Sequence, residues 1–455
     1  MPDIVEVVGR RKTEAPLFPV LLLLQVFSAV QGLWLVITIA ITTRRLFKTS
    51  SKTILTGPGD VRDGPSFMID LLCNNYLNSC ILDACSPATL IRLALSCRDA
   101  AEIVKAYIRL RFNVDRLLIP FFSDVAAFRV LQAETGMLIS GSTALQFFLR
   151  TTYAYSDLDL YVHRDHRVVV GRYLLDSGYT FVPNNHQNPD FLEAVSQNSI
   201  DSVTGNYGRM YGVATVFTFQ NAEFRTVQVI LAVSSPLAVV LLYHSSAQTF
   251  AILLARTDFA TPLACILNVI SHDMAYCLYP RATLEDRCSL LLRPDEILDP
   301  IVMNKYVNRG FQFAICAREE DAAFLPGQLR WLGDKYCWRI PVNTSAIATV
   351  PEPDTLTNSS WRLVNTPRAK MEFDVLSSPG FQNVYIAGDS TVRAMFVAFS
   401  LFSKTLLEND IPYDFDVEFH RFCTFWLSKH SFADFSFEYP LNLPMLMTHL
   451  ARIAL

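Results

Sequence analysis

The longest apolar run in the chain lies close to the N-terminus. Residues 17–42 contain no charged side chain, and only Gln25 and Gln31 are strongly polar. A helix over this run would extend about 39 Å, which exceeds the roughly 30 Å hydrocarbon core of a bilayer. We therefore predict a transmembrane helix at 17–42, after a tail at 1–16 and before a linker at 43–66. A buried core helix, or extra sequence from a mis-set start of the reading frame, would give the same pattern.

The segment after the linker has helical periodicity. Between residues 67 and 122, apolar residues recur at intervals of three and four, which predicts short amphipathic helices. Ser86 and Pro87 suit the N-cap and the first turn of one of these helices. The sequence therefore predicts a small helical unit ahead of the main domain.

Helical and strand patterns alternate in the main domain, which we place at 123–290. A short apolar run at 137–140 precedes a helical pattern at 143–149, and strand character returns at 158–162. Two further runs, GVATVFTF and FRTVQVIL, flank the turn QNAE and predict a hairpin. The fold class predicted for the whole chain is α+β, and the remainder at 291–455 is predicted to be an α/β extension. Within it, RWLGDKYCWRIPV predicts a second hairpin or strand pair.

A second apolar stretch, at 236–254, is interrupted by Tyr243, His244 and two serines. These polar residues favour a buried core helix over a membrane helix. The dipeptide HS before residues 246–264 would continue naturally into CILN after them. We therefore predict that 246–264 is an insertion, such as a translated intron.

Composition narrows the class and the compartment. Of the 455 residues, 51% are hydrophobic and 18% are charged, which excludes a disordered or low-complexity chain. The net charge of -4 gives no general attraction to nucleic acid or to anionic lipid. Ten cysteines without a C-x-x-C pair argue against a disulfide scaffold and favour a reducing compartment. We expect the body on the cytosolic side of the membrane, although cations flank both ends of 17–42, or a cytoplasmic protein if that run is not an anchor.

Paired acids supply the main candidate chemistry. Asp157 and Asp159 alternate with leucines, so a strand would place both carboxylates on one face. Two hard oxygen ligands at that spacing suit Mg²⁺ carrying a nucleoside triphosphate. Upstream, Gly141 would let a phosphate approach the backbone, and Ser142 opens a helix whose N–H groups favour anions.

The order apolar strand, Gly-Ser, short helix and Asp-Leu-Asp-Leu resembles the polymerase-beta-like nucleotidyltransferase superfamily over about residues 125–290. The resemblance implies a mixed sheet flanked by helices, with Asp157 and Asp159 as catalytic metal ligands and Gly141 and Ser142 as the nucleotide-binding bend. Mg²⁺ would be the cofactor, a nucleoside triphosphate the substrate, and the acceptor is undefined.

The third acid of that family is missing from the expected strand. Gln228 stands at the position where the resemblance implies a carboxylate, and a neutral amide is a poor base. Glu223 precedes the strand and has the opposite parity, so it is an unconvincing substitute. The sequence therefore leaves open an active enzyme, a nucleotide-binding relic and a purely structural domain.

The stretch ILDACSPATLIRLALSCRDAAEIVKAYI, within 67–122, resembles a degenerate F-box without the usual leading Leu-Pro. This resemblance implies docking to a ubiquitin-ligase adaptor, and a helical lead packed on the next domain would explain the same pattern. The alternative function is therefore a non-enzymatic adaptor that uses the main domain as a platform.

A third function class comes from NVYIAGDSTVRAMFVAFSLF, which resembles the nucleophile block of GDS-type esterases. In that family Ser390 would be the nucleophile, with His420 as base and Asp416 as orienting acid. A strand-to-helix turn capped by Asp389 or Ser390 is the structural alternative. His272, Asp273 and Tyr276 could in addition line a substrate cleft, although a core histidine is the commoner case.

Overall fold

The computed structural model describes residues 75–154, 156–197, 212–243, 263–292, 300–318, 320–347, 356–365, 369–407 and 414–430. The predicted transmembrane helix at 17–42 and the linker at 43–66 lie outside these ranges, as does the predicted insertion except for its last two residues. Within the ranges given, no helix is both long enough and apolar enough to cross a membrane.

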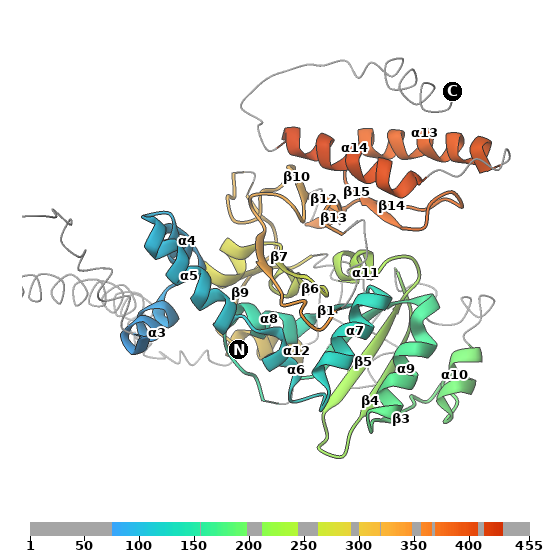
Figure 1. The fold of residues 1–455 in the computed structure, drawn as a ribbon, viewed down its shortest axis with the longest axis horizontal. Helices are drawn as coiled ribbons and strands as arrows, with labels where there is room; N and C mark the ends of the chain where they lie inside the picture. The colour runs from blue at the N-terminus through green and yellow to red at the C-terminus, as the bar shows by residue number, and fades with distance from the viewer. Residues whose placement is uncertain are drawn as a thin grey trace, which may run out of the picture.

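An eight-stranded mixed sheet forms the centre of the molecule, in the order β11-β7-β6-β1-β2-β5-β4-β3 (Figure 1). Its strands are β1 (Leu138–Ser140), β2 (Leu158–His163), β3 (Thr180–Val182), β4 (Val213–Gln220), β5 (Thr226–Ala232), β6 (Asn268–Ile270), β7 (Met274–Cys277) and β11 (Trp338–Pro341). Strand β2 runs antiparallel to β1 and parallel to β5. The expected mixed sheet is therefore present.

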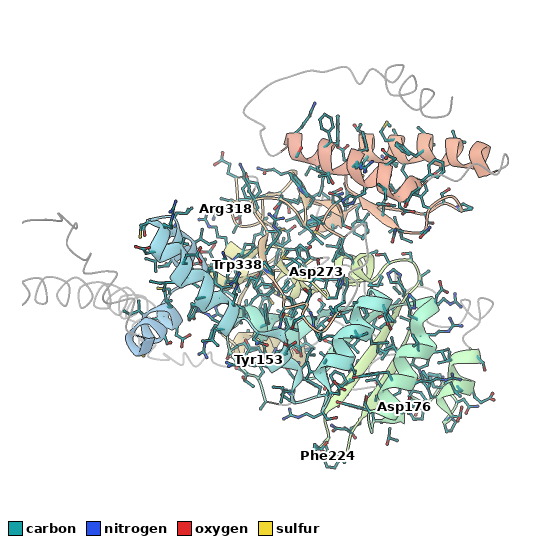
Figure 2. All side chains as sticks on the ribbon, viewed as in Figure 1. Tyr153, Asp176, Phe224, Asp273, Arg318 and Trp338 are labelled. Carbon is teal, nitrogen blue, oxygen red and sulfur yellow. The ribbon has the colours of Figure 1, made fainter. Side chains whose placement is uncertain are left out.

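The predicted hairpin in the main domain is confirmed. Strands β4 and β5 pair antiparallel, and Gln220 opposes Thr226 at the turn. The first strand alternates buried and half-buried residues, as expected for an antiparallel strand with one covered face. Phe224 lies at the tip of this hairpin with 80% of its surface exposed (Figure 2).

Helices cover the sheet and continue into the C-terminal third. They are α3 (Asn75–Ala84), α4 (Pro87–Ala94), α5 (Arg98–Arg111), α6 (Val114–Leu118), α7 (Val125–Thr135), α8 (Gly141–Leu149), α9 (Arg167–Asp176), α10 (Phe191–Gln197), α11 (Pro236–Tyr243), α12 (Pro300–Asn308), α13 (Ser390–Leu407) and α14 (Phe415–His430). One core joins Leu158 and Leu160 of the sheet to apolar residues of α3–α9. A second core joins Tyr161, on the other face, to α11 and to the C-terminal third. The fold class is α+β.

The helical segment before the main domain packs directly on it. Ser86 caps α4, as predicted, and accepts from the Thr89 N–H at 3.3 Å. Arg150, at the end of α8, donates to the Tyr107 hydroxyl of α5 at 2.7 Å and to the backbone carbonyls of Leu82 and Cys85. These bonds fix α3–α5 against the body.

Residues 288–430 contain three small sheets and the helix pair α13 and α14, which lies beyond β14 and β15 in Figure 1. The strands of the small sheets are β8 (Cys288–Leu290) with β9 (Gln312–Ala314), β10 (Leu329–Trp331) with β12 (Ser360–Val364) and β13 (Lys370–Glu372), and β14 (Asp374–Leu376) with β15 (Tyr385–Ala387). The prediction of a hairpin at RWLGDKYCWRIPV is wrong, because β10 pairs with β12 whereas β11 pairs with β7. The main sheet therefore extends past the boundary that we placed at residue 290.

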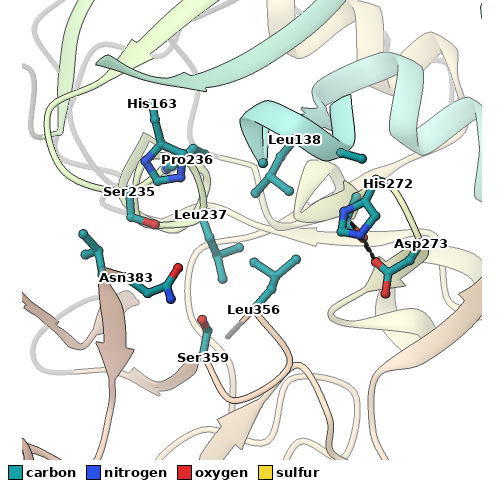
Figure 3. A pocket seen from close by; sticks show the side chains of 14 residues that line it. Leu138, His163, Ser235, Pro236, Leu237, His272, Asp273, Leu356, Ser359 and Asn383 are labelled. Atoms are coloured by element: carbon teal, nitrogen blue, oxygen red, sulfur yellow. Dashed lines mark hydrogen bonds and ion pairs between the residues drawn. The ribbon is translucent and has the colours of Figure 1, made fainter. Parts of the chain in front are cut away.

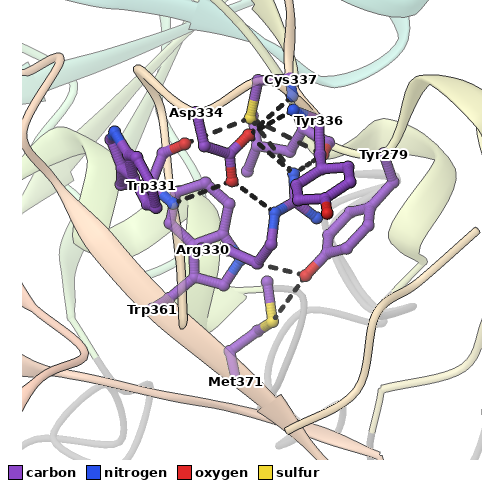
Figure 4. A network of polar contacts seen from close by, with 9 residues as sticks. Tyr279, Arg330, Trp331, Asp334, Tyr336, Cys337, Trp361 and Met371 are labelled. Carbon is purple, nitrogen blue, oxygen red and sulfur yellow. Dashed lines mark hydrogen bonds and ion pairs between the residues drawn. The ribbon is translucent and has the colours of Figure 1, made fainter. Parts of the chain in front are cut away.

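A buried ion pair holds the segment between those two strands (Figure 4). Arg330 and Asp334 are each 1% exposed, and their Nε and Oδ2 atoms lie 2.5 Å apart. Asp334 also accepts from the backbone N–H groups of Tyr336 and Cys337 at 2.9 and 2.8 Å. Arg330 donates to the Leu278 carbonyl at 2.9 Å. These bonds direct the chain from the small sheet into the large one.

Candidate functional site

The two predicted acids lie at the start of β2. Asp157 directly precedes the strand and Asp159 is its second residue; both are half-buried. Leu158 and Leu160 are fully buried in the helix-covered core, so they anchor the strand between the acids. Alternation turns the Asp159 side chain to the opposite face, as the sequence predicted.

The predicted glycine bend lies against Asp159. Ser140, the last residue of β1, pairs with Asp159 in the antiparallel register, and Gly141 follows with a φ of +68°. A Cβ at Gly141 would overlap the Asp159 Oδ2 atom and lie 3.1 Å from its Cγ. Only a residue without a side chain therefore fits between the start of α8 and this carboxylate.

Hydroxyl groups fasten α8 to the segment before β2. Ser142 Oγ lies 3.0 Å from Ser156 Oγ, and Thr143 Oγ1 donates to the Asp157 carbonyl at 2.6 Å. The Ser142 hydroxyl is therefore used inside the protein, and its backbone N–H, in the first turn of α8, is the group available for a phosphate. Sequence reasoning missed Thr143 and Ser156, whose only signal was their position beside the two motifs.

Gln228 occupies the same rung as Asp159. The parallel pairing of β2 with β5 sets these two residues side by side. Gln228 is 3% exposed, and its Oε1 atom is buried without a hydrogen-bond partner in the described parts of the chain. The predicted third position is thus beside Asp159, whereas Glu223 is exposed in the turn before β5.

Asp159 also affects the pKa of Tyr161, which lies on the same face of β2. Burial raises the pKa of Tyr161, the next residue on that face, well above its usual value, and the Asp159 carboxylate raises this pKa further. A phenol held neutral beside a carboxylate adds no charge to the site.

Two carboxylates and one buried amide oxygen suit Mg²⁺, which prefers oxygen ligands. The buried Gln228 oxygen, which has no hydrogen-bond partner among the described residues, fits a role as the third ligand of such an ion. Among the described residues, no group of three or more His, Cys, Asp or Glu side chains could hold a metal.

A cavity of about 160 Å³ lies at the opposite ends of the same strands (Figure 3). Leu138 begins β1 and His163 ends β2, whereas Ser140 and Asp159 face each other at the acid end. His272 and Asp273 line this cavity, as the sequence suggested for a cleft, but the Tyr276 hydroxyl bonds to Thr357 at 3.0 Å. None of Gly141, Ser142, Asp157, Asp159 and Gln228 lines it, so it is separate from the acid pair.

The predicted esterase residues have structural contacts. Asp416 accepts from the backbone N–H of Gln382 at 2.7 Å and from the Tyr385 hydroxyl at 2.8 Å. The His420 Nδ1 atom lies 3.0 Å from Asn358 Nδ2. Ser390 is exposed at the start of α13. Asp389 accepts from the Thr391 and Val392 N–H groups at 2.9 and 3.2 Å, which is the capping role that we named as the alternative.

Comparisons with protein-family models, with curated proteins and with solved structures gave no match to this chain. The function is therefore argued from the geometry of the site.

Proposed function

We propose that the main domain is a nucleotidyltransferase-like module that binds a Mg²⁺–nucleoside triphosphate and transfers the nucleotidyl group poorly or not at all. The observation that carries this proposal is the register of Asp159, which has Ser140 and the Gly141 bend on one side and Gln228 on the other. The sequence motifs and their arrangement in space thus support the same site.

Asp157, Asp159 and the Gln228 amide oxygen would hold the ion. Bound Mg²⁺ would neutralise phosphate charge and orient the triphosphate. The Gly141 bend holds the Asp159 carboxylate against the start of α8, where the first N–H groups of the helix would donate to a phosphate on the bound ion. Helix α8 is held in place by the Thr143 bond to the Asp157 carbonyl, so donors and acids keep a fixed relation.

Gln228 weakens catalysis for two reasons. An amide carries no charge to balance the ion, and it does not accept a proton from an attacking hydroxyl at neutral pH. Binding needs only the acid pair and the bend, whereas transfer also needs a base. We therefore expect nucleotide binding to persist where transfer is lost.

Magnesium-dependent binding of ATP and GTP to the full chain in detergent tests the proposal. Asp157→Ala and Asp159→Ala should each weaken binding by at least about tenfold, since each removes a charged ligand. Asp176→Ala, at the exposed end of α9 (Figure 2), is the matched control and should bind as the unaltered chain does. Equal affinity in all four proteins, or binding that does not depend on Mg²⁺, would refute the assignment.

A further inference from the structure

A second concave surface lies between the helical segment and the edge of the main sheet. This groove has a volume of about 670 Å³, in the range of ligand sites, and it is formed by α4, α5 and the start of α6 on one side and by residues 339–343 on the other. It is distinct from the acid pair and from the histidine-lined cavity, with which it shares no residue.

The floor of the groove is apolar and firmly packed. Val104 and Phe112 are 2% and 3% exposed, and the Phe112 ring packs edge-on against Trp338 with 5.1 Å between centroids. Val114 and Val342 extend this floor. Because these side chains belong to the main core, the groove is a rigid feature of the fold.

The rim of the groove is basic. Lys105, Arg109 and Arg339 line it and are exposed. Arg109 and Arg339 form no ion pair with any residue in the described ranges, and Lys105 has only an exposed contact of 3.6 Å with Glu102. The one acid in the lining, Asp115, is directed to the buried Arg129 at 3.9 Å. Positive charge therefore surrounds an apolar floor in a chain whose net charge is -4.

The groove also borders an open sheet edge. Strand β11 is the last strand of the sheet and pairs only with β7 among the described strands. The Val342 N–H donates to the Asp273 carbonyl at 2.7 Å, so alternation turns the backbone groups of Arg339 outward. Pro341, the next outward residue, has no N–H and suits an edge strand. The edge thus offers the Arg339 N–H and two carbonyl groups to an added chain.

We propose that this groove binds an extended acidic peptide segment of about five residues that carries apolar side chains at alternate positions. The groove residues on α5 and its C-cap, from Ala101 to Phe112, extend over about 16 Å along the helix axis. This is the length of about five residues of an extended peptide. Apolar side chains would contact the floor, acidic ones would pair with Arg109 and Arg339, and the backbone would bond to the edge of β11. A nucleic acid fits less well, because the aromatic rings at the groove are buried and offer no stacking surface.

Fluorescence anisotropy with the full chain tests this binding mode. The probe is a fluorescein-labelled peptide of four Glu-Leu repeats, and the matched peptide has Lys in place of Glu. We expect saturable binding of the acidic peptide, weakened by salt, and at least about tenfold weaker binding of the basic one. Arg109→Glu and Arg339→Glu should each weaken acidic-peptide binding, and the double variant should prefer the basic peptide.

Arg172→Glu, an exposed reversal on α9, is the control and should leave peptide binding unchanged. Equal binding of the two peptides, no saturation up to about 1 mM, or an unchanged preference in the double variant would overturn the proposal. Displacement of the peptide by a twelve-residue oligouridylate at lower concentration would overturn it in favour of nucleic acid. Binding of ATP uses other residues, so a failure here leaves the nucleotide proposal intact.

Discussion

Asp159 of β2 and Gln228 of β5 occupy the same rung of two parallel neighbouring strands. Strands so paired lie about 4.8 Å apart, so the two side chains share one local environment. One is a carboxylate and the other is an amide whose Oε1 atom is buried and has no hydrogen-bond partner among the described residues. In the proposed site, this pair would set the charge around a bound cation.

The variant Gln228→Glu should couple stability to Mg²⁺. A third carboxylate at a position 3% exposed, beside Asp159, repels its neighbour and loses hydration, which costs about 1–3 kcal/mol without a cation. Bound Mg²⁺ should offset this cost, so added MgCl₂ should raise the melting temperature of the variant more than that of the unaltered chain. Gln220→Glu, at the half-buried end of β4, is the control. The same response to Mg²⁺ in all three proteins would contradict a cation site here.

Local patterns predicted local structure well. Alternation over 213–220 and 226–232 was enough for the β4–β5 hairpin, and the Gly-Ser pair marked the start of α8. The pairing partners of distant strands were not accessible in this way, because periodicity identifies a strand and says nothing about its neighbour. Strand β11 has an ordinary alternating pattern, and nothing in that pattern names β7 as its partner.

For the candidate site, too, the sequence predicted the local motifs but not the contacts between distant residues. Both motifs were visible as short strings, and the expected position of Gln228 beside them followed from the family resemblance. The bonds of Ser142 and Thr143 were not predictable, since each joins residues 14 positions apart through a loop without periodicity. The basic groove was missed because its rim comes from α5 and β11, which are far apart in the sequence.

Gly141→Ala should abolish Mg²⁺-dependent ATP binding in addition to lowering the stability of the fold. An alanine there would suffer the strain of a positive φ, about 1–2 kcal/mol, and would also displace the Asp159 carboxylate. Gly178→Ala provides a matched control, because Gly178 has a φ of +86° and open space around its missing Cβ. Both variants should lose stability in denaturant unfolding, but only Gly141→Ala should lose Mg²⁺-dependent ATP binding. Retained binding in Gly141→Ala would show that the bend plays no part in the site.

Breaking the buried ion pair should destabilise the C-terminal third. Asp334→Ala leaves Arg330 buried without its partner and removes the acceptor for three backbone N–H groups, so we expect a loss of about 3–5 kcal/mol. The double variant Arg330→Met with Asp334→Leu should lose less, because no charge remains buried. Urea unfolding followed by tryptophan fluorescence measures both. A double variant less stable than Asp334→Ala would mean that the ion pair is not the main contribution.

His163 should make the fold sensitive to acid. Burial, with a smaller contribution from the nearby His166, lowers the pKa of His163 from its usual 6.5 to about 4, while Asp165 and the Ser234 backbone act in the opposite direction. The folded chain therefore keeps this imidazole neutral, whereas the unfolded chain binds a proton near pH 6.5. The stabilisation is complete above pH 6.5 and is lost as the pH falls toward 4, up to about 3 kcal/mol. The free energy of unfolding of His163→Gln should vary less over that interval, while His186→Gln, in an exposed loop, should follow the unaltered chain. Parallel pH profiles for all three proteins would show that His163 titrates normally in the fold.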